Sequence, residues 1–101
     1  MNTQHVTVVR IYLTEAEHRL APLLDYLREH VKVRGVTVFR GISGFGQSGT
    51  IHSARLVDLS LDLPLVVEFF DAPHWIESIL AHIGADIDPG HIVSWPATLL
   101  V

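Results

Sequence analysis

Residues 57–69 read VDLSLDLPLVVEF, and this stretch decides the fold. Every odd position in it is apolar, whereas most even positions carry a polar residue or a proline. A period of two is typical of a strand with one buried face. We therefore expect a strand over residues 54–70, with Pro64 marking a bulge or a break. Its other face carries Asp58, Asp62 and Glu68, which indicates a solvated or ion-paired surface.

Just before this strand, residues 44–49 read GFGQSG, which has the G-x-G-x-x-G spacing of a dinucleotide-binding loop. That loop requires a strand before it and a helix after it, because the helix N-terminus supplies amide donors to the phosphates. Here a strand follows, and no lysine comes after the last glycine. The spacing is therefore not a Rossmann or phosphate-loop motif. Gly44 and Gly46 fit either a tight exit from a strand or a close approach to a ligand, with positive φ or an anion-binding nest.

The other strands and helices are predicted from the spacing of apolar residues and from the prolines, glycines and aspartates that start or end them. Pro22 is placed most cheaply in the first turn of a helix, and Asp71 and Pro73 are typical of the start of a second helix, which Gly84 ends. Pro96 favours an edge position for the last strand. The expected elements are strands over residues 6–13, 36–43, 54–70 and 91–100 and helices over residues 20–30 and from 71 to 83. The order βαββαβ predicts one α+β domain over residues 1–101, a ferredoxin-like sandwich with an antiparallel four-stranded sheet and two helices on one face.

Composition narrows the class of protein. The chain has 101 residues, no cysteine and a formal charge of −4, which argues against disulfides and against nonspecific binding to nucleic acid. No apolar run is long enough to span a membrane, and no secretory signal is visible, so a cytoplasmic location without membrane insertion is expected. Hydrophobic residues make up 49% of the chain, which is high for a small monomer and indicates apolar surface that meets a partner.

A longer pattern surrounds the glycine stretch: a TV-x-RG-x-x-GFG run, then an IH pair, then LS-x-DLP and an acidic residue before the second helix. In this pattern the chain closely resembles a family of small bacterial and archaeal proteins, domain of unknown function 190. One departure lies before Pro22, where the family usually has a glycine and this chain has Leu20 and Ala21. The matching residues are Thr37, Val38, Arg40, Gly41, Gly44, Phe45, Gly46, Ile51, His52, Leu59, Ser60, Asp62, Leu63, Pro64 and Asp71.

That family is similar to the PII signalling proteins, which are trimers that bind adenine nucleotides between subunits and engage a transporter, enzyme or regulator through a loop. The resemblance implies a homotrimer that binds a small anionic effector, and an adenine nucleotide is the expected one. It implies no resident cofactor and no catalytic residues. Residues 84–92 take the place of the PII phosphate loop, but His91 replaces its lysine, and Asp86 and Asp88 repel phosphate, which favours a nucleotide with few phosphates. The candidate ligand-binding residues are Arg40, Gly44, Phe45, Gly46, Gln47, Ser48, His52, Gly84, Gly90 and His91.

Other interpretations stay open at this point. Arg40 either binds an anion or pairs with Glu68 or Asp62 across the sheet. Trp75 and Trp95 are expected in the core or in subunit contacts. Seven histidines suggest a metal-binding trimer like the divalent-cation tolerance proteins, although no H-E-x-x-H motif or helical histidine pair at i, i+4 occurs. A dimeric ferredoxin-like enzyme of the small oxygenase type would need few catalytic residues and a cavity inside one protomer.

Overall fold

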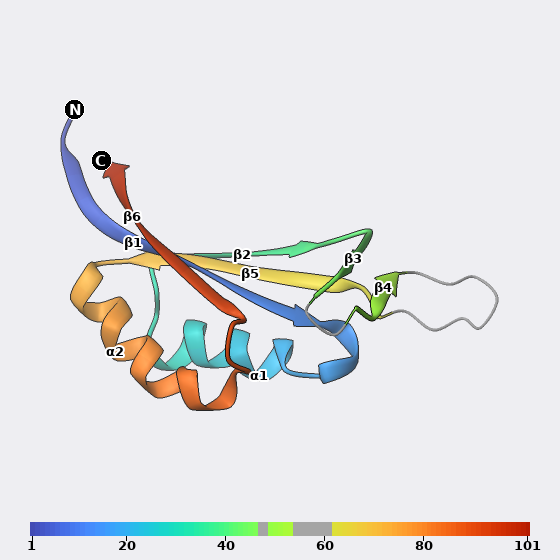
Figure 1. Cartoon of the computed structure of the whole chain (residues 1–101). Helices are drawn as coiled ribbons and strands as arrows, with labels where there is room; N and C mark the ends of the chain where they lie inside the picture. The colour runs from blue at the N-terminus through green and yellow to red at the C-terminus, as the bar shows by residue number, and fades with distance from the viewer. Residues whose placement is uncertain (47–48, 54–61) are drawn as a thin grey trace.

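The computed structural model describes residues 1–46, 49–53 and 62–101, and it has the predicted βαββαβ order with one added hairpin (Figure 1). Short 3₁₀ turns lie over Glu15–Glu17 and Gly84–Asp86. The first helix begins as α1 and continues as a π-helical turn over Tyr26–His30. The regular elements are β1 (Thr3–Thr14), α1 (Leu20–Asp25), β2 (Gly35–Arg40), β3 (Ser43–Phe45), β4 (Ile51–Ser53), β5 (Pro64–Asp71), α2 (Pro73–Ile83) and β6 (Ile92–Leu100).

The main sheet has the strand order β2-β5-β1-β6, with every neighbouring pair antiparallel. Both helices lie on one face of this sheet (Figure 1). This is the predicted ferredoxin-like architecture. Pro96 lies in β6, an edge strand, as expected, and Pro64 is the first residue of β5, so that the proline marks the start of the strand.

The core lies between the sheet and the helices. Leu65, Val67 and Phe69 of β5 are buried, which confirms the period of two over the described part of that stretch; residues 57–61 lie outside the described residues. Burying each such side chain contributes about 1.5–3 kcal/mol. The core also contains Val9, Ile11, Leu13, Leu23, Leu27, Ile76, Ile79, Ile83 and Ile87.

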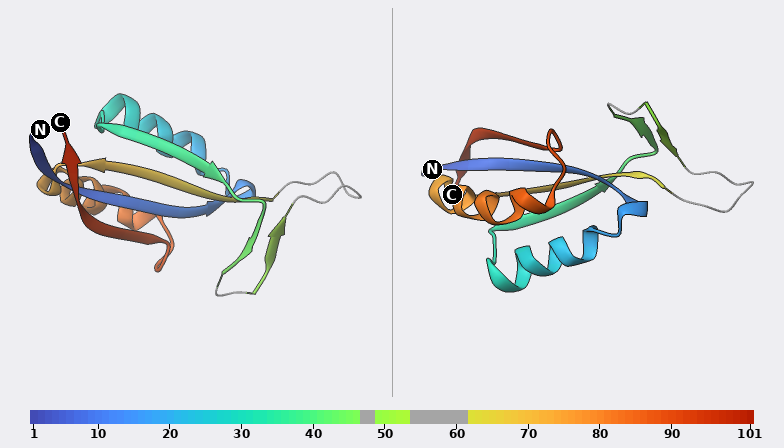
Figure 2. Two further views of the ribbon diagram at one scale, coloured as in Figure 1. Left: turned by 90° about the horizontal axis from the view of Figure 1, so that it is seen from above. Right: turned by 60° about the horizontal axis from the view of Figure 1, so that its bottom comes forward.

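The strand predicted over residues 36–43 is shorter than expected, because β2 ends at Arg40. Arg40 pairs with Leu65, and β5 begins one residue earlier, so β2 has no partner strand beyond this point. The chain turns, and Ser43–Phe45 pairs with Ile51–Ser53 as a separate two-stranded hairpin. The predicted loop over residues 44–53 therefore contains a hairpin, which leaves the end of the main sheet at an angle (Figure 2).

Helix α2 starts differently from the prediction. Its N-cap is Ala72, with Pro73 in the first turn as expected. The carboxylate of Asp71 accepts hydrogen bonds from the amide of Arg34 at 2.9 Å and from that of Ala72 at 2.7 Å. Asp71 therefore ties the segment before β2 to the start of α2, which a short side chain at the end of β5 can do because β5 and β2 are neighbours.

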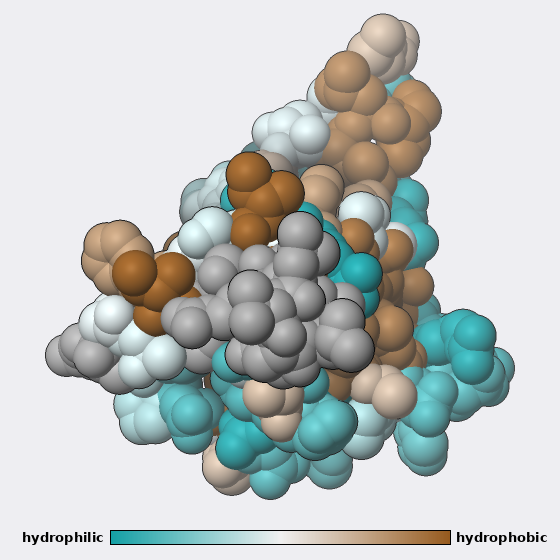
Figure 3. Space-filling view, turned by 90° about the vertical axis from the view of Figure 1, so that its right-hand side faces the viewer, coloured by the Kyte–Doolittle hydropathy of each residue, from teal (hydrophilic) through white to brown (hydrophobic). Residues whose placement is uncertain are grey.

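The other face of the sheet is not covered by a helix. At its centre, Arg10 of β1 donates from Nε to Oε1 of Glu68 at 2.8 Å, and this hydrogen bond raises the pKa of the Arg10 guanidinium. The guanidinium carbon lies 5.8 Å from the ring centre of Phe39 and 5.7 Å from that of Trp95. Apolar surface is visible on this upper side of the molecule, whereas the surface over the helices is mostly polar (Figure 3).

The pairing predicted between Arg40 and Glu68 is corrected here, and of the two places predicted for the tryptophans the core is excluded. Glu68 pairs with Arg10 and not with Arg40. Trp75 and Trp95 are each 38% exposed, so neither belongs to the core of the protomer, and they lie on opposite sides of the molecule: one on α2, the other beside Arg10 on the uncovered face.

Candidate functional site

The candidate residues gather at one end of the sheet, but on two different edges. β1 and β2 end there, and β5 and β6 begin there, so that Arg40, Leu65 and Leu13 lie side by side. His91 precedes β6 at the same end, and its carbonyl accepts a hydrogen bond from the amide of Tyr12 at 2.9 Å. Adjacent strands are about 4.8 Å apart, so three spacings separate β2 from β6 by about 14 Å. Within one protomer, Arg40 and His91 do not form one contact site.

Arg40 forms an ion pair that the sequence did not reveal. Its Nη2 contacts Oε1 of Glu15, in the 3₁₀ turn after β1, so the predicted pairing with Glu68 or Asp62 is wrong. Asp62 instead accepts a hydrogen bond from the amide of Ala16 at 3.0 Å. The Glu15 side chain is only 17% exposed, whereas that of Arg40 is 61% exposed. A carboxylate withdrawn from water in this way requires a partner, and Arg40 supplies it.

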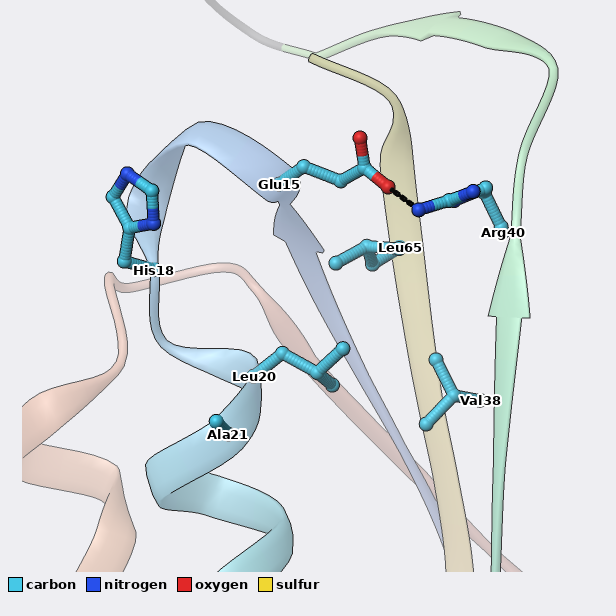
Figure 4. Close-up of a pocket in the computed structure, with 7 residues that line it drawn as sticks. All are labelled: Glu15, His18, Leu20, Ala21, Val38, Arg40 and Leu65. Atoms are coloured by element: carbon cyan, nitrogen blue, oxygen red, sulfur yellow. Dashed lines mark ion pairs between the residues drawn. The ribbon is translucent and has the colours of Figure 1, made fainter. Parts of the chain in front are cut away.

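A pocket of about 730 Å³ lies beside this ion pair. Glu15 and Arg40 reach toward one another above Leu65 and close one end of it, while Leu20 and Ala21 of α1 face Val38 of β2 (Figure 4). The complete lining is Glu15, His18, Leu20, Ala21, Val38, Arg40 and Leu65. The pocket therefore combines an apolar floor with a pair of opposite charges.

The lead-in to α1 fixes Glu15. Its amide donates to the carbonyl of Leu63 at 3.1 Å, and the 3₁₀ turn that follows ends at His18, which has a φ of 55°. The sequence analysis assigned no strand or helix to residues 14–19 and did not identify Glu15 as a candidate. A local signal is present in the Thr14-to-Glu17 spacing, and Thr14 Oγ1 donates to Glu17 Oε1 at 3.3 Å, but Thr14 does not cap the turn with its side chain.

The glycine stretch forms the base of the hairpin. Gly44 pairs with His52 through the backbone, and Phe45 lies opposite Ile51 with its side chain 76% exposed. Gln47 and Ser48 lie outside the described residues. Neither Gly44 nor Gly46 has positive φ, and a Cβ at Gly46 would meet nothing within 4 Å.

The positive φ and the close approach expected at Gly44 and Gly46 are found instead at two other glycines. Gly49 has a φ of 79°. Gly41 lies so close to Pro64 that a Cβ there would be 2.7 Å from Cγ of the proline. The resemblance placed Gly41 in the family pattern, but only the fold reveals which proline it packs against.

Side-chain contacts add to the backbone hydrogen bond from Tyr12 in holding the segment from Gly84 to His91 to the rest of the protomer. Arg19 Nη1 donates to the carbonyl of Asp86 at 2.6 Å and lies 4.0 Å from Asp88 Oδ1. Nδ1 of His91 is 3.1 Å from the carbonyl of Tyr12, and since a carbonyl only accepts, Nδ1 carries the proton. Gly90 has a φ of 84°, whereas Gly84 is α-helical at −59°.

The described residues also bear on metals and membranes. No group of three or more histidines or acidic residues is placed to hold a metal ion in residues 1–46, 49–53 and 62–101. Over the same residues, no helix is long and apolar enough to cross a membrane.

Two kinds of known protein match this chain. Two proteins of Aquifex aeolicus (strain VF5), both named UPF0166 protein, are 38% identical over 80 residues and 36% identical over 63 residues. The first alignment covers 75% of this chain and 76% of the relative, and the second covers 60% and 62%.

Solved structures of CPII from Thiomonas intermedia K12, a nitrogen regulatory PII-like protein, have the same fold. One, bound to ADP and bicarbonate, has a TM-score of 0.65 at 17% identity and covers 99% of this chain and 91% of CPII. Another, bound to ADP, AMP and bicarbonate, has a TM-score of 0.64 at 16% identity and covers 100% and 99%. The model of domain of unknown function 190, described as "Uncharacterized ACR", matches residues 6–99, and the chain belongs to this family and has a PII-like fold.

Proposed function

We propose that this chain is a cytoplasmic PII-like regulatory protein. It assembles as a homotrimer, binds an adenine nucleotide in the clefts between subunits, and regulates a partner protein through the segment after β2. The observation that carries this proposal is the position of Arg40 and His91 at the same end of the sheet but on opposite edges.

A ring of protomers brings those two edges together. In a closed ring, the β2 edge of one sheet faces the β6 edge of the next, since each interface joins two different surfaces. Arg40 and the pocket of one protomer then lie beside residues 84–91 of its neighbour. Exposed sheet edges are a liability in a monomer, and such a ring covers them.

The uncovered sheet face supports the same assembly. Phe39, Tyr12, Trp95 and Val93 are exposed on the protomer although they surround the Arg10–Glu68 ion pair. A contiguous apolar surface of this kind marks a protein contact. Packing three such faces around a central axis removes these side chains from water.

The PII-like structures support the choice of ligand, because CPII is bound to ADP in one and to ADP and AMP in another. The backbone amides of the hairpin base and of residues 84–91 are suited to an anion, with Gly90 allowing the turn through its positive φ. Asp86 and Asp88 favour a mono- or diphosphate over a triphosphate. The pocket is bounded by the edge strand β2 and not enclosed in the core, which favours a cleft between protomers over the internal cavity of an oxygenase-type enzyme. A non-enzymatic regulator is therefore proposed.

The hairpin is the proposed contact with the regulated protein, a transporter or an enzyme. It projects from the end of the sheet (Figure 2), with Phe45 and Ile51 exposed on it and Ile42 exposed just before it. Large apolar side chains on a projecting element are suited to insertion into a partner surface.

Calorimetric titration with AMP, ADP, ATP and cyclic nucleotides, with and without magnesium, tests the ligand, and light scattering tests the assembly. The proposal expects a trimer that binds AMP or ADP in the micromolar to low millimolar range. A monomer, or a trimer that binds none of these nucleotides, would contradict it.

A further inference from the structure

The pocket beside the Glu15–Arg40 pair is suited to one part of a nucleotide. We infer that this pocket holds the uncharged ring of the nucleotide, its adenine base, and not its phosphate. The inference rests on the proposed function, because it takes an adenine nucleotide as the ligand and asks which group of it enters this pocket.

The charges of the pocket argue against a phosphate. Arg40 is already paired with Glu15, so the pair carries no net charge. A phosphate bound to Arg40 would lie beside the Glu15 carboxylate, because Arg40 contacts that carboxylate. The two negative charges would then repel each other. Displacing Glu15 instead would leave a carboxylate that is only 17% exposed without its partner, which is strongly unfavourable. His18 also lines the pocket, away from the Glu15–Arg40 pair.

The floor of the pocket is suited to a flat ring. Leu20 and Ala21 on one side and Val38 and Leu65 on the other present aliphatic surface. The volume of about 730 Å³ falls in the range of roughly 300–1,000 Å³ that is typical of small-molecule sites. Such sites combine an apolar lining with a few fixed polar groups that orient the ligand.

The polar end of the pocket matches the edge of adenine. The Glu15 carboxylate only accepts hydrogen bonds, and Arg40 only donates them. Adenine presents an amino donor beside a ring-nitrogen acceptor, so both groups find partners. Arg40 uses Nη2 for Glu15, and a guanidinium has five N–H donors, so it can hold Glu15 and the base together. Glu15 itself is fixed by its amide, which donates to Leu63.

Inosine provides a test of this polar match. Its base has a carbonyl where adenine has the amino group, and that carbonyl would face the Glu15 carboxylate. When a ligand loses its hydrogen bond to a charged group, or presents an acceptor where a donor is needed, its affinity falls about tenfold or more. We therefore expect adenosine to bind at least about tenfold more tightly than inosine.

The variant Ala21→Phe tests the location. Ala21 is exposed on α1, and a phenyl group there would fill the pocket without entering the core. We expect it to weaken adenosine and AMP by the same factor, about tenfold or more, since both carry the base. Ala81→Phe on α2 makes the same chemical change at another exposed helix position and should leave both affinities unchanged. Thermal unfolding shows whether each variant is folded.

The variant Glu15→Gln separates base from phosphate and does not depend on the folding of Ala21→Phe. If the base lies here, the adenosine preference over inosine falls, and the ratio of AMP to adenosine affinity stays within about threefold of wild type. If Arg40 instead binds the phosphate, freeing it raises that ratio more than about tenfold, which overturns the inference.

The failures can be told apart. If wild type binds neither adenosine, AMP nor ADP, the nucleotide proposal and this inference both fall. If wild type binds AMP but Ala21→Phe leaves the affinity unchanged, only the assignment of this pocket to the base is overturned.

Discussion

The amide of Gly41 donates a hydrogen bond to the carbonyl of Pro64 across 2.8 Å, and a Cβ at Gly41 would lie 2.7 Å from Cγ of the same proline. The two residues close the end of the β2–β5 pair, where the chain leaves the sheet for the hairpin. Pro64, the first residue of β5, therefore lies beside Gly41, the residue that follows β2.

Gly41→Ala should therefore lower the free energy of unfolding by about 1–3 kcal/mol, because the added methyl group forces Pro64 or the turn to move. Gly46→Ala is the matched control: no atom lies within 4 Å of its Cβ position, and its φ is not positive. The control should be neutral or slightly stabilising. Urea denaturation of both variants measures the difference, and equal effects would contradict the proposed role of Gly41.

A second pair of glycines differs in backbone conformation alone. Gly90 has a φ of 84°, whereas Gly84 has a φ of −59°, and neither position has an atom within 4 Å of a built Cβ. Gly90→Ala should cost about 1–2 kcal/mol, the penalty of a left-handed residue with a side chain. Gly84→Ala should be neutral or stabilising. A loss of stability in Gly84→Ala that matched that of Gly90→Ala would show that conformation is not the cause.

Much of the fold could be predicted from the sequence, because it depends on periodicity. The alternation around Leu65, Val67 and Phe69 identified β5. Pro73 and Gly84 marked the start and the end of α2, whose buried residues Ile76, Ile79 and Ile83 lie three and four residues apart, as one helix face requires. The hairpin could not be predicted, since β3 and β4 have three residues each and no alternating pattern reaches significance over that length.

The site was less predictable, because its contacts join residues far apart in the chain. The Arg40–Glu15 and Arg19–Asp86 contacts follow from the arrangement of strands and not from any local motif. Charge alone suggested Glu68 as a partner for Arg40, but β5 places Glu68 beside Arg10 on the opposite face of the sheet. Gln47 and Ser48 remain candidates that the described residues do not test.

The two tryptophans provide a test of the assembly. They are equally exposed, but Trp95 lies on the uncovered sheet face and Trp75 on α2. If three sheet faces pack together, Trp95→Ala removes a large interface side chain and should weaken the trimer by about 2 kcal/mol or more. Trp75→Ala should leave the trimer intact. Light scattering over a dilution series compares them, and trimers of equal stability would place the interface elsewhere.

The Asp71 carboxylate offers a test of the join between β2 and α2. Asp71→Ala removes the acceptor of two backbone amides, those of Arg34 and Ala72, and should cost about 1–3 kcal/mol. Asp71→Asn keeps an acceptor oxygen and should recover part of that loss. Thermal unfolding of the two variants decides this, and an unchanged midpoint in Asp71→Ala would mean that water replaces the carboxylate without cost.

The central claim is that each nucleotide site joins the β2 edge of one protomer to residues 84–91 of the next, and mixed trimers test it most directly. Arg40→Glu and His91→Glu each place a negative charge on one side of the site, and each variant alone should lose AMP binding. When the two variants are refolded together, some interfaces join the Arg40 of a His91→Glu protomer to the His91 of an Arg40→Glu protomer. Such an interface contains a complete site. We predict that calorimetry of the mixture recovers about a quarter of the wild-type AMP sites, as random assembly of a ring requires. A mixture that binds no AMP, although each variant is folded and the mixed trimers form, would place the site within a single protomer and contradict the account.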